Sequence, residues 1–372
     1  MERFHSSVDI FQEFRISPTR GFLPATDPLG SLGPAFSAWE ETAQNLPHLV
    51  ANQSIQKQLA SLPNFQLVKI KTAPQRERAL QILSFIGHAW LLESEKLSVP
   101  PLLAQPWSQI SQQLQRPPVI AHPSYVLHNW YLSVPEQGIT YSNLNVIQEF
   151  VGGKDEAAFI LLTVMMEKHG AKAIRAIIEG IEAAHQENFS SLLSCLKIIQ
   201  DSVSEMTKTF ELMRHECHPD AFYADIRPYL ASFNGLVMQG VGKEEAQDYH
   251  GGSAAQSSIL QSLDAALGLS HPPHGARAFL VKMRDYMPRV HARFVEALEQ
   301  EQIIAKVSKL DSSIAKARQA CIEAIVTFRN EHLKIMAEYI ILPAKGKDII
   351  GTGGTHPSRF LKSVRDASKQ SE

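Results

Sequence analysis

The sequence predicts an all-α protein, and three observations support this class. One continuous apolar stripe at helical spacing runs through residues 192–213, over about six turns. A second long amphipathic pattern runs from about Asp311 to Leu342, where Pro343 ends it. The alternating patterns of strands are scarce along the 372 residues. We expect a large helical domain built on long helices and a smaller, mainly helical N-terminal domain.

The bulk composition is that of a soluble globular protein, with 44% hydrophobic and 20% charged residues. A net charge of −2, with both signs interspersed, argues against a nucleic-acid-binding or membrane-surface protein. The longest strongly apolar stretch, residues 157–166, is bounded by Glu156 and Glu167 and is too short for a bilayer, which needs about 20 residues. We therefore expect neither nucleic acid nor a membrane as partner.

Cysteine usage and the N-terminus indicate the compartment. The three cysteines are few, odd in number and widely spaced, which is typical of a reducing environment without a disulfide framework. The first residues, MERFHS, lack the basic segment and apolar run of a signal peptide. The sequence therefore predicts a cytoplasmic protein.

The N-terminal part is expected to be a smaller domain, residues 1–148, that includes an apolar connector. Residues 1–30 are punctuated by Pro and Gly and predict a mostly irregular lead-in. Short helical patterns follow in residues 31–97, the clearest from Leu80 to Leu97, before Pro100.

The connector between Lys96 and Glu136 has Arg116 as its only formally charged residue. Seven prolines are expected to break any regular element there: Pro100, Pro101, Pro106, Pro117, Pro118, Pro123 and Pro135. Because Trp107 and Trp130 lie in it, this connector must be covered. It is either packed against the core or forms the wall of a pocket.

The large domain is expected to span residues 149–372. Its clearest helix carries the stripe Leu192, Leu196, Ile199, Val203, Met206, Phe210 and Met213, and Pro219 closes it. Helical patterns also fit residues 154–169, 171–186, 253–267 and 274–299.

His332 is the first candidate for chemistry, since it lies on the apolar stripe of the second long helix, between Phe328 and Ile335. A histidine that faces a core needs a partner for its ring nitrogens, and a satisfied core histidine is the commoner case. The alternative is a metal ligand. A single histidine without a second ligand at metal-site spacing suits a haem iron better than zinc.

Three other segments carry polar or glycine residues. Residues 214–218, RHECH, fit no zinc spacing, so we interpret them as a solvated helix end. Residues 251–258, GGSAAQSS, either place free backbone N–H groups against a ligand or simply cap a helix. Residues 351–355, GTGGT, lack the Lys-Ser/Thr of a phosphate loop and suit a flexible loop or lid.

Together these segments resemble the indoleamine 2,3-dioxygenase family, in order and spacing. The resemblance covers residues 110–372 well and the first hundred residues loosely. It rests on GGSAAQSS at 251–258, FRNEH at 328–332 continuing to 339–344, GTGGT at 351–355, AFY at 221–223 with Arg227, and residues 127–130 with 140–141.

The resemblance implies a b-type haem and a site around it. His332 matches the proximal ligand of the haem iron, and Arg329 and Asp264 match the surroundings of a haem propionate. The loop against haem and substrate is matched by Gly252, Ser253 and Ala254.

The same resemblance implies a pocket for an indole amino acid. Phe159 and Phe222 match the aromatic walls, and Arg227 matches the group that binds the substrate carboxylate, for which a planar guanidinium is well suited. Thr352 matches a residue of the mobile loop that closes over the ammonium and carboxylate groups.

Three residues depart from the animal enzymes in this pocket. Thr163 replaces a distal serine, His122 a tyrosine, and Tyr125 a cysteine at the substrate site. We expect Thr163 and His122 to be the distal catalytic-site residues, without either being an obligatory base, because attack of dioxygen on the indole needs none.

The implied reaction is cleavage of the indole 2,3-bond of L-tryptophan, or of a related indoleamine, by O₂ to give N-formylkynurenine. It requires an electron donor that keeps the iron ferrous. Three alternatives remain: a haem protein acting on another indole derivative, an oxygen- or ligand-binding haem protein with little turnover, and a helical scaffold without a cofactor. A carboxylate-binding Arg227 argues against the second.

Overall fold

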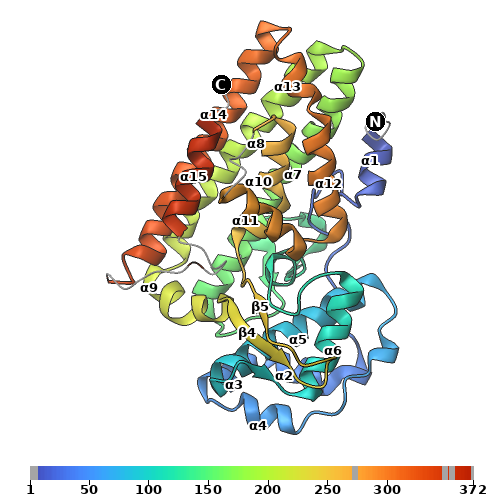
Figure 1. Ribbon diagram of the computed structural model, residues 1–372, viewed down its shortest axis with the longest axis vertical. Coiled ribbons are helices and arrows are strands. Elements are labelled where there is room, and N and C mark those ends of the chain that lie inside the picture. The colour runs from blue at the N-terminus through green and yellow to red at the C-terminus, as the bar shows by residue number, and fades with distance from the viewer. Residues whose placement is uncertain (1–6, 270–274, 346–350, 352–356, 370–372) are drawn as a thin grey trace.

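The computed structural model describes residues 7–269, 275–345, 351 and 357–369, and it confirms the all-α class (Figure 1). Three long helices form the framework: α7 (Gly153–His185), α8 (Phe189–Glu216) and α14 (Ser312–Met336). Helix α8 packs against both α7 and α14. Shorter helices surround them, namely α9 (Pro219–Ala221), α10 (Ser258–Ala266), α11 (Ala276–Met283), α12 (Arg289–Glu301), α13 (Ile303–Val307) and α15 (Pro357–Lys369).

Two of the long helices follow the predicted patterns closely. All seven residues of the α8 stripe are buried, and the Asn188 side chain caps the helix by accepting a hydrogen bond from the N–H of Ser191. Asp311 caps α14 in the same way, at the predicted start. The predicted extension of this helix to about Leu342 is confirmed, although its last turn, η10 (Ala337–Ile341), is π-helical.

Two other helical predictions were wrong at glycine or proline. The patterns at 154–169 and 171–186 form one helix, α7, which runs through Gly170. A Cβ at Gly170 would lie 2.4 Å from Ile259 Cδ1, so this glycine allows close packing of α10 and does not end the helix. The pattern at 274–299 is instead divided into α11, the 3₁₀ turn η9 (Arg284–Tyr286) and α12, which begins after Pro288.

The N-terminal helices after the first form a second group around α5, whereas the first helix, α1, lies against α7 (Figure 1). Helix α5 (Ala73–Ser94) begins before the predicted Leu80, because Thr72 and Gln75 form a capping box. The other bounds are α1 (Ser7–Glu13), within the lead-in predicted to be mostly irregular, α2 (Ser37–Gln44), α3 (Leu46–Ala51), α4 (Ile55–Ala60) and α6 (Pro101–Leu114).

Helix α6 contradicts the prediction that prolines break every regular element of the connector. Pro101 occupies the first turn, where its missing N–H has no intrahelical partner to lose. Pro106 lies inside the helix, where burial of Leu103, Trp107 and Ile110 offsets one lost backbone hydrogen bond.

The short strands of the described residues form two small sheets, and one of these sheets joins the two groups of helices. β1 (Ser98–Val99) pairs in parallel with β4 (Phe233–Met238), which pairs antiparallel with β5 (Gln247–Tyr249). β2 (Trp130–Leu132) pairs antiparallel with β3 (Leu144–Val146). Because β1 and β4 come from opposite sides of residue 148, the two parts share a sheet, and a domain boundary at 148 stays a prediction.

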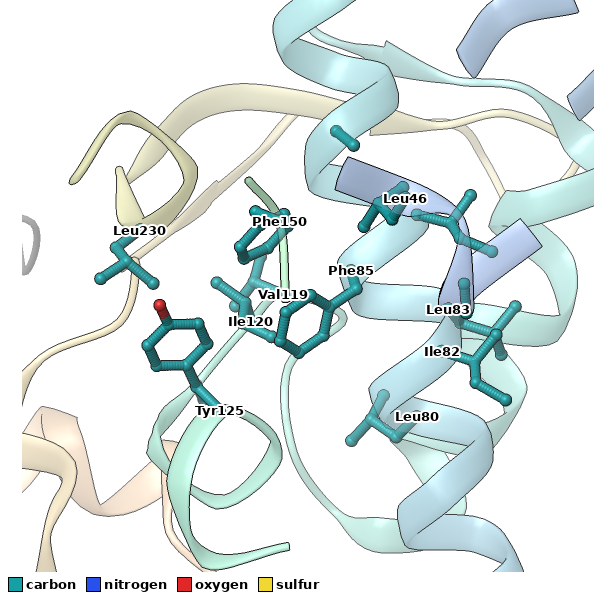
Figure 2. Close-up of a cluster of buried hydrophobic side chains, with 14 of the residues drawn as sticks. Leu46, Leu80, Ile82, Leu83, Phe85, Val119, Ile120, Tyr125, Phe150 and Leu230 are labelled. Carbon is teal, nitrogen blue, oxygen red and sulfur yellow. The ribbon is translucent and has the colours of Figure 1, made fainter. Parts of the chain in front are cut away.

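The connector serves both of the purposes that the sequence left open. Trp107 and Trp130 are fully buried in the core, as the first interpretation requires. Farther along, the chain enters a π-helical turn, η3 (Pro123–Leu127), whose Tyr125 and Val126 line an internal cavity. Figure 2 shows a buried hydrophobic cluster in which the side chain of Tyr125 lies at one side and residues of α5, such as Ile82 and Leu83, lie at the other. Among the helices of the described ranges, none combines the length and apolar composition needed to span a bilayer.

Candidate active site

A cavity of about 300 Å³ lies between α7, α8, α14, the η3 turn and the segment 251–258. Its walls are mostly apolar, with Met206, Phe210, Met213 and Met336 among them. It brings together these predicted site residues: His122, Tyr125, Phe159, Thr163, Phe222, Gly252, Ser253, Ala254, Asp264, Arg329 and His332. Residues more than 200 positions apart in the chain therefore meet in one place.

His332 enters the cavity from α14. Its ring stacks on Phe210 of α8, with centroids 5.7 Å apart and planes at 18°. Burial, and then the nearby Arg329 guanidinium, lower the pKa of His332 to about 4. The imidazole is therefore neutral near pH 7, and no side chain in the described ranges hydrogen-bonds to it, which leaves a nitrogen lone pair for a ligand.

Arg329 and Asp264 form a buried ion pair beside this histidine, with Nη2 and Oδ2 2.6 Å apart. Arg329 also donates a hydrogen bond to Ser368 of α15. Both members of the pair are almost fully buried. The pair places a positively charged group and a carboxylate at the edge of an otherwise apolar cavity.

The part of the wall formed by α7 and the η3 turn carries the hydroxyl groups of Thr163 and Tyr125. Thr163 Oγ1 donates to the carbonyl oxygen of Phe159, one turn earlier in α7, at 2.7 Å. Tyr125 Oη donates to Glu156 Oε1 at 3.2 Å, and burial followed by this carboxylate raises the pKa of Tyr125. Both hydroxyl protons are thus directed away from the cavity.

Two carboxylates that bound the apolar stretch 157–166 in the sequence are buried. Glu156 accepts hydrogen bonds from the backbone N–H groups of Phe150, Val151 and Gly152 just before α7. Glu167 lies on the cavity wall, and its Oε1 contacts His122 Nε2 at 2.8 Å and accepts a hydrogen bond from Ser257 at 2.6 Å.

The segment 251–258 combines both roles that the sequence left open. Ser253 and Ser257 cap η8 (Ala254–Gln256) and α10 through their side chains. The segment also lines the cavity and lies very close to η7 (Arg227–Leu230), since a Cβ at Gly251 would be 2.0 Å from the Leu230 carbonyl oxygen. Gln256 accepts a hydrogen bond from the His122 N–H at 3.0 Å.

Arg227 is not among the residues that line the cavity. It begins η7, directly after the π-helical turn η6 (Phe222–Ile226) that supplies Phe222, and its guanidinium lies 5.3 Å above the Tyr223 ring. Burial lowers the pKa of Arg227, but an arginine remains protonated. Its contact with a substrate stays a prediction, and Thr352 lies outside the described residues.

The RHECH segment has no metal-site geometry. His215 and His218 are exposed at the end of α8, as expected of a solvated helix end, whereas Cys217 is buried. Across the described part of the chain, no group of three or more His, Cys, Asp or Glu side chains is arranged to hold a metal ion. The single imidazole of His332 is the kind of ligand that a haem iron takes from a protein.

Comparison with known proteins identifies the family. The model of the indoleamine 2,3-dioxygenase family matches residues 10–371. This chain belongs to the indoleamine 2,3-dioxygenase family. Indoleamine 2,3-dioxygenase 2 of Mus musculus is 33% identical to it, over 96% of this chain and 94% of that protein. Indoleamine 2,3-dioxygenase 1 of Mus musculus is 30% identical, over 97% and 95%. A 6-hydroxytryptophan 2,3-dioxygenase of Fusarium equiseti is 28% identical, over 95% and 96%.

The indoleamine 2,3-dioxygenases are haem enzymes, and the residues of this cavity fit such a group. The neutral imidazole of His332 faces the cavity, aromatic and Met side chains line it, and a buried guanidinium lies at its edge. A flat apolar macrocycle with acidic substituents requires these three features.

The sequence analysis missed several residues of this indoleamine 2,3-dioxygenase site. Glu167 appeared only as the polar boundary of an apolar stretch, and Gln256 and Ser257 only as part of a motif. Glu167 is four residues after Thr163, and therefore on the same face of α7, which is the signal that could have identified it. Phe210 was predicted only as a member of the apolar stripe of α8, and its stacking on His332 was not predicted.

Proposed function

We propose that this protein is a dioxygenase that cleaves the indole 2,3-bond of L-tryptophan to N-formylkynurenine with a b-type haem carried by His332. The observation that carries the proposal is the neutral His332 ring, which faces a large apolar cavity in a chain of this family. The haem, when bound, supplies the redox chemistry with O₂ that side chains do not offer.

The residues of the cavity would bind and orient the substrate. The rings of Phe159 and Phe222, with centroids 4.6 Å apart, offer aromatic surface to an indole. Arg227 would bind the substrate carboxylate after a small movement of η7 toward the cavity or of the substrate toward Arg227. Ser253, Ala254 and Thr352 would contact the amino-acid end of the substrate. The apolar walls exclude water from the reacting atoms.

Proton transfer is not assigned to an enzymic base. The Thr163 hydroxyl is too weak a base near neutral pH, and its proton is bonded to a backbone carbonyl. An external electron donor would keep the iron ferrous. Three free and buried cysteines are compatible with the expected cytoplasmic location.

The decisive experiment is a turnover assay on the haem-loaded protein. With L-tryptophan, a reductant and air, we expect the absorbance of N-formylkynurenine to appear. The variant His332→Ala should lose stoichiometric haem, whereas His215→Ala, which changes an exposed histidine, should keep it. An unchanged Soret band in His332→Ala, or a wild type without product, would overturn the proposal.

A modified tryptophan is the second candidate substrate. His122, Tyr125 and Thr163 change the cavity wall relative to the animal enzymes, and one relative is named for 6-hydroxytryptophan. Comparison of kcat/KM for L-tryptophan and 6-hydroxy-L-tryptophan distinguishes the two candidates.

A further inference from the structure

His122 is held at the cavity wall from two sides. Its backbone N–H donates to Gln256 Oε1 at 3.0 Å, and its Nε2 lies 2.8 Å from Glu167 Oε1. Glu167 is itself fixed by Ser257, whose hydroxyl donates to the same oxygen. The side chains of His122 and Glu167 are only 5% and 3% exposed, so the pair is rigid and shielded from solvent.

This arrangement sets which ring nitrogen of His122 remains available. A carboxylate oxygen only accepts, so the proton of a neutral imidazole lies on Nε2 and points at Glu167. The second nitrogen, Nδ1, then carries a lone pair and makes no hydrogen bond to any residue of the described ranges. Since His122 lines the cavity, this lone pair is available to a ligand.

Two hydroxyl groups of the same wall are already engaged as donors within the protein. Thr163 and Tyr125 already donate to Phe159 and Glu156, and their hydroxyl protons point away from the cavity. The indole substrate of the proposed function carries two kinds of N–H donor, at the ring nitrogen and at the ammonium group. A buried N–H without an acceptor is costly, so the wall needs an acceptor for one of them.

We propose that His122 Nδ1 accepts a hydrogen bond from an N–H group of the bound indole substrate, and that Glu167 is the positioning residue that fixes this ring. The inference rests on the proposed function and deepens it, because it assigns part of the substrate specificity to a pair that the animal enzymes, with a tyrosine at this position, do not share.

The test compares ligands that differ in one group. Dissociation constants of haem-loaded protein, without O₂, are measured by calorimetry for L-tryptophan, 1-methyl-L-tryptophan, indole-3-propionate and tryptamine. His122→Leu should raise the dissociation constant of L-tryptophan about tenfold, which is the effect of losing one buried hydrogen bond. It should leave unchanged the ligand that lacks the recognised N–H, which is 1-methyl-L-tryptophan for the ring nitrogen or indole-3-propionate for the ammonium.

Variants of Glu167 separate positioning from packing. Glu167→Leu should reproduce this ligand-specific loss, whereas Glu167→Gln should retain most of the affinity, because an amide oxygen still accepts from Nε2. If Glu167→Leu does not fold, Glu167→Asp, with its shorter side chain, replaces it. This variant should raise the dissociation constants of the same ligands by about threefold. Glu179→Gln, which removes a partly exposed charge from the same helix, is the matched control.

Two results would overturn the inference. An equal loss for all four ligands in His122→Leu would mean that the histidine only packs. A loss for every ligand except tryptamine would make the ring a donor to the carboxylate. If the wild type forms N-formylkynurenine in either case, only this inference fails; if it binds none of the ligands, the proposed function fails as well.

Discussion

The Thr163 hydroxyl lies at the cavity wall but forms its hydrogen bond within its own helix. Because its proton is bonded to the Phe159 carbonyl, Thr163→Val should leave kcat/KM for L-tryptophan within about a hundredfold of the wild type, the low end of general acid–base catalysis. Steady-state kinetics with matched haem content measures this. A loss of several thousandfold would show that the hydroxyl turns toward the substrate.

Arg227 supports a prediction about the substrate carboxylate. Truncating one partner of a desolvated charge pair costs about 2–5 kcal/mol. Arg227→Ala should therefore weaken L-tryptophan binding well over tenfold while haem content stays normal. Arg227→Lys should lose less of this affinity, because it keeps the positive charge. Calorimetry with L-tryptophan and tryptamine measures it. Equal affinity of the wild type for both ligands would contradict this role.

Sequence and structure agree on single residues where the local pattern is decisive. The His332 position on an apolar stripe was visible, but whether it met a partner depended on Phe210, a residue more than a hundred positions away. Glu167 was not predicted because a charged residue at the end of an apolar stretch normally faces solvent. Its partner, His122, lies in a different element.

At the scale of elements, the close approach of segment 251–258 to η7 depends on Gly251. A Cβ there would lie 2.0 Å from a backbone oxygen that cannot rotate away. Gly251→Ala should therefore lower the free energy of unfolding by about 1–3 kcal/mol, as overpacking does. Urea denaturation measures it, with Gly30→Ala as control, since nothing lies within 4 Å of a Cβ at that exposed glycine. Equal stability of both variants would contradict the tight contact.

Whether an element was predictable depended on how its faces are buried. Helix α8 has one buried stripe and its bounds followed from the sequence, whereas α5 is buried on most of its surface and lost its periodicity. Glycine and proline were misjudged at Gly170 and Pro106, because tertiary packing there outweighs their local tendency to end a helix.

Across the whole molecule, His88 joins three parts of the chain. This buried residue of α5 contacts the carbonyl oxygen of Tyr229 in η7 through Nδ1 at 2.8 Å, and its Nε2 accepts from the N–H of Ile120 in the connector at 2.9 Å. One ring thus uses both nitrogens, and only the neutral form satisfies both bonds. Burial lowers the pKa of His88 to about 4.

This depressed pKa predicts an acid-sensitive fold. Between pH 6.5 and 4 the unfolded chain holds a proton on this histidine that the folded chain does not, so stability falls as the pH falls through this window and levels off below it. His88→Gln, which keeps a donor and an acceptor but does not titrate, should reduce the loss between pH 6.5 and pH 5 by about 2 kcal/mol. Urea denaturation at both values measures the difference, and parallel losses in both proteins would contradict it.

The π-helical turns η3, η6 and η10 each contribute to the cavity wall, through Tyr125, Phe222 and Tyr339 respectively. A π turn holds one residue more than an α turn between the same bonded groups, and it is closed by i→i+5 bonds such as that from Leu342 N–H to Ala337. Gain or loss of one residue at these turns would rotate the next side chains by about 100° and leave the flanking helix axes in place. Homologous enzymes of this architecture therefore have a route to new substrates through the gain or loss of a single residue at these turns.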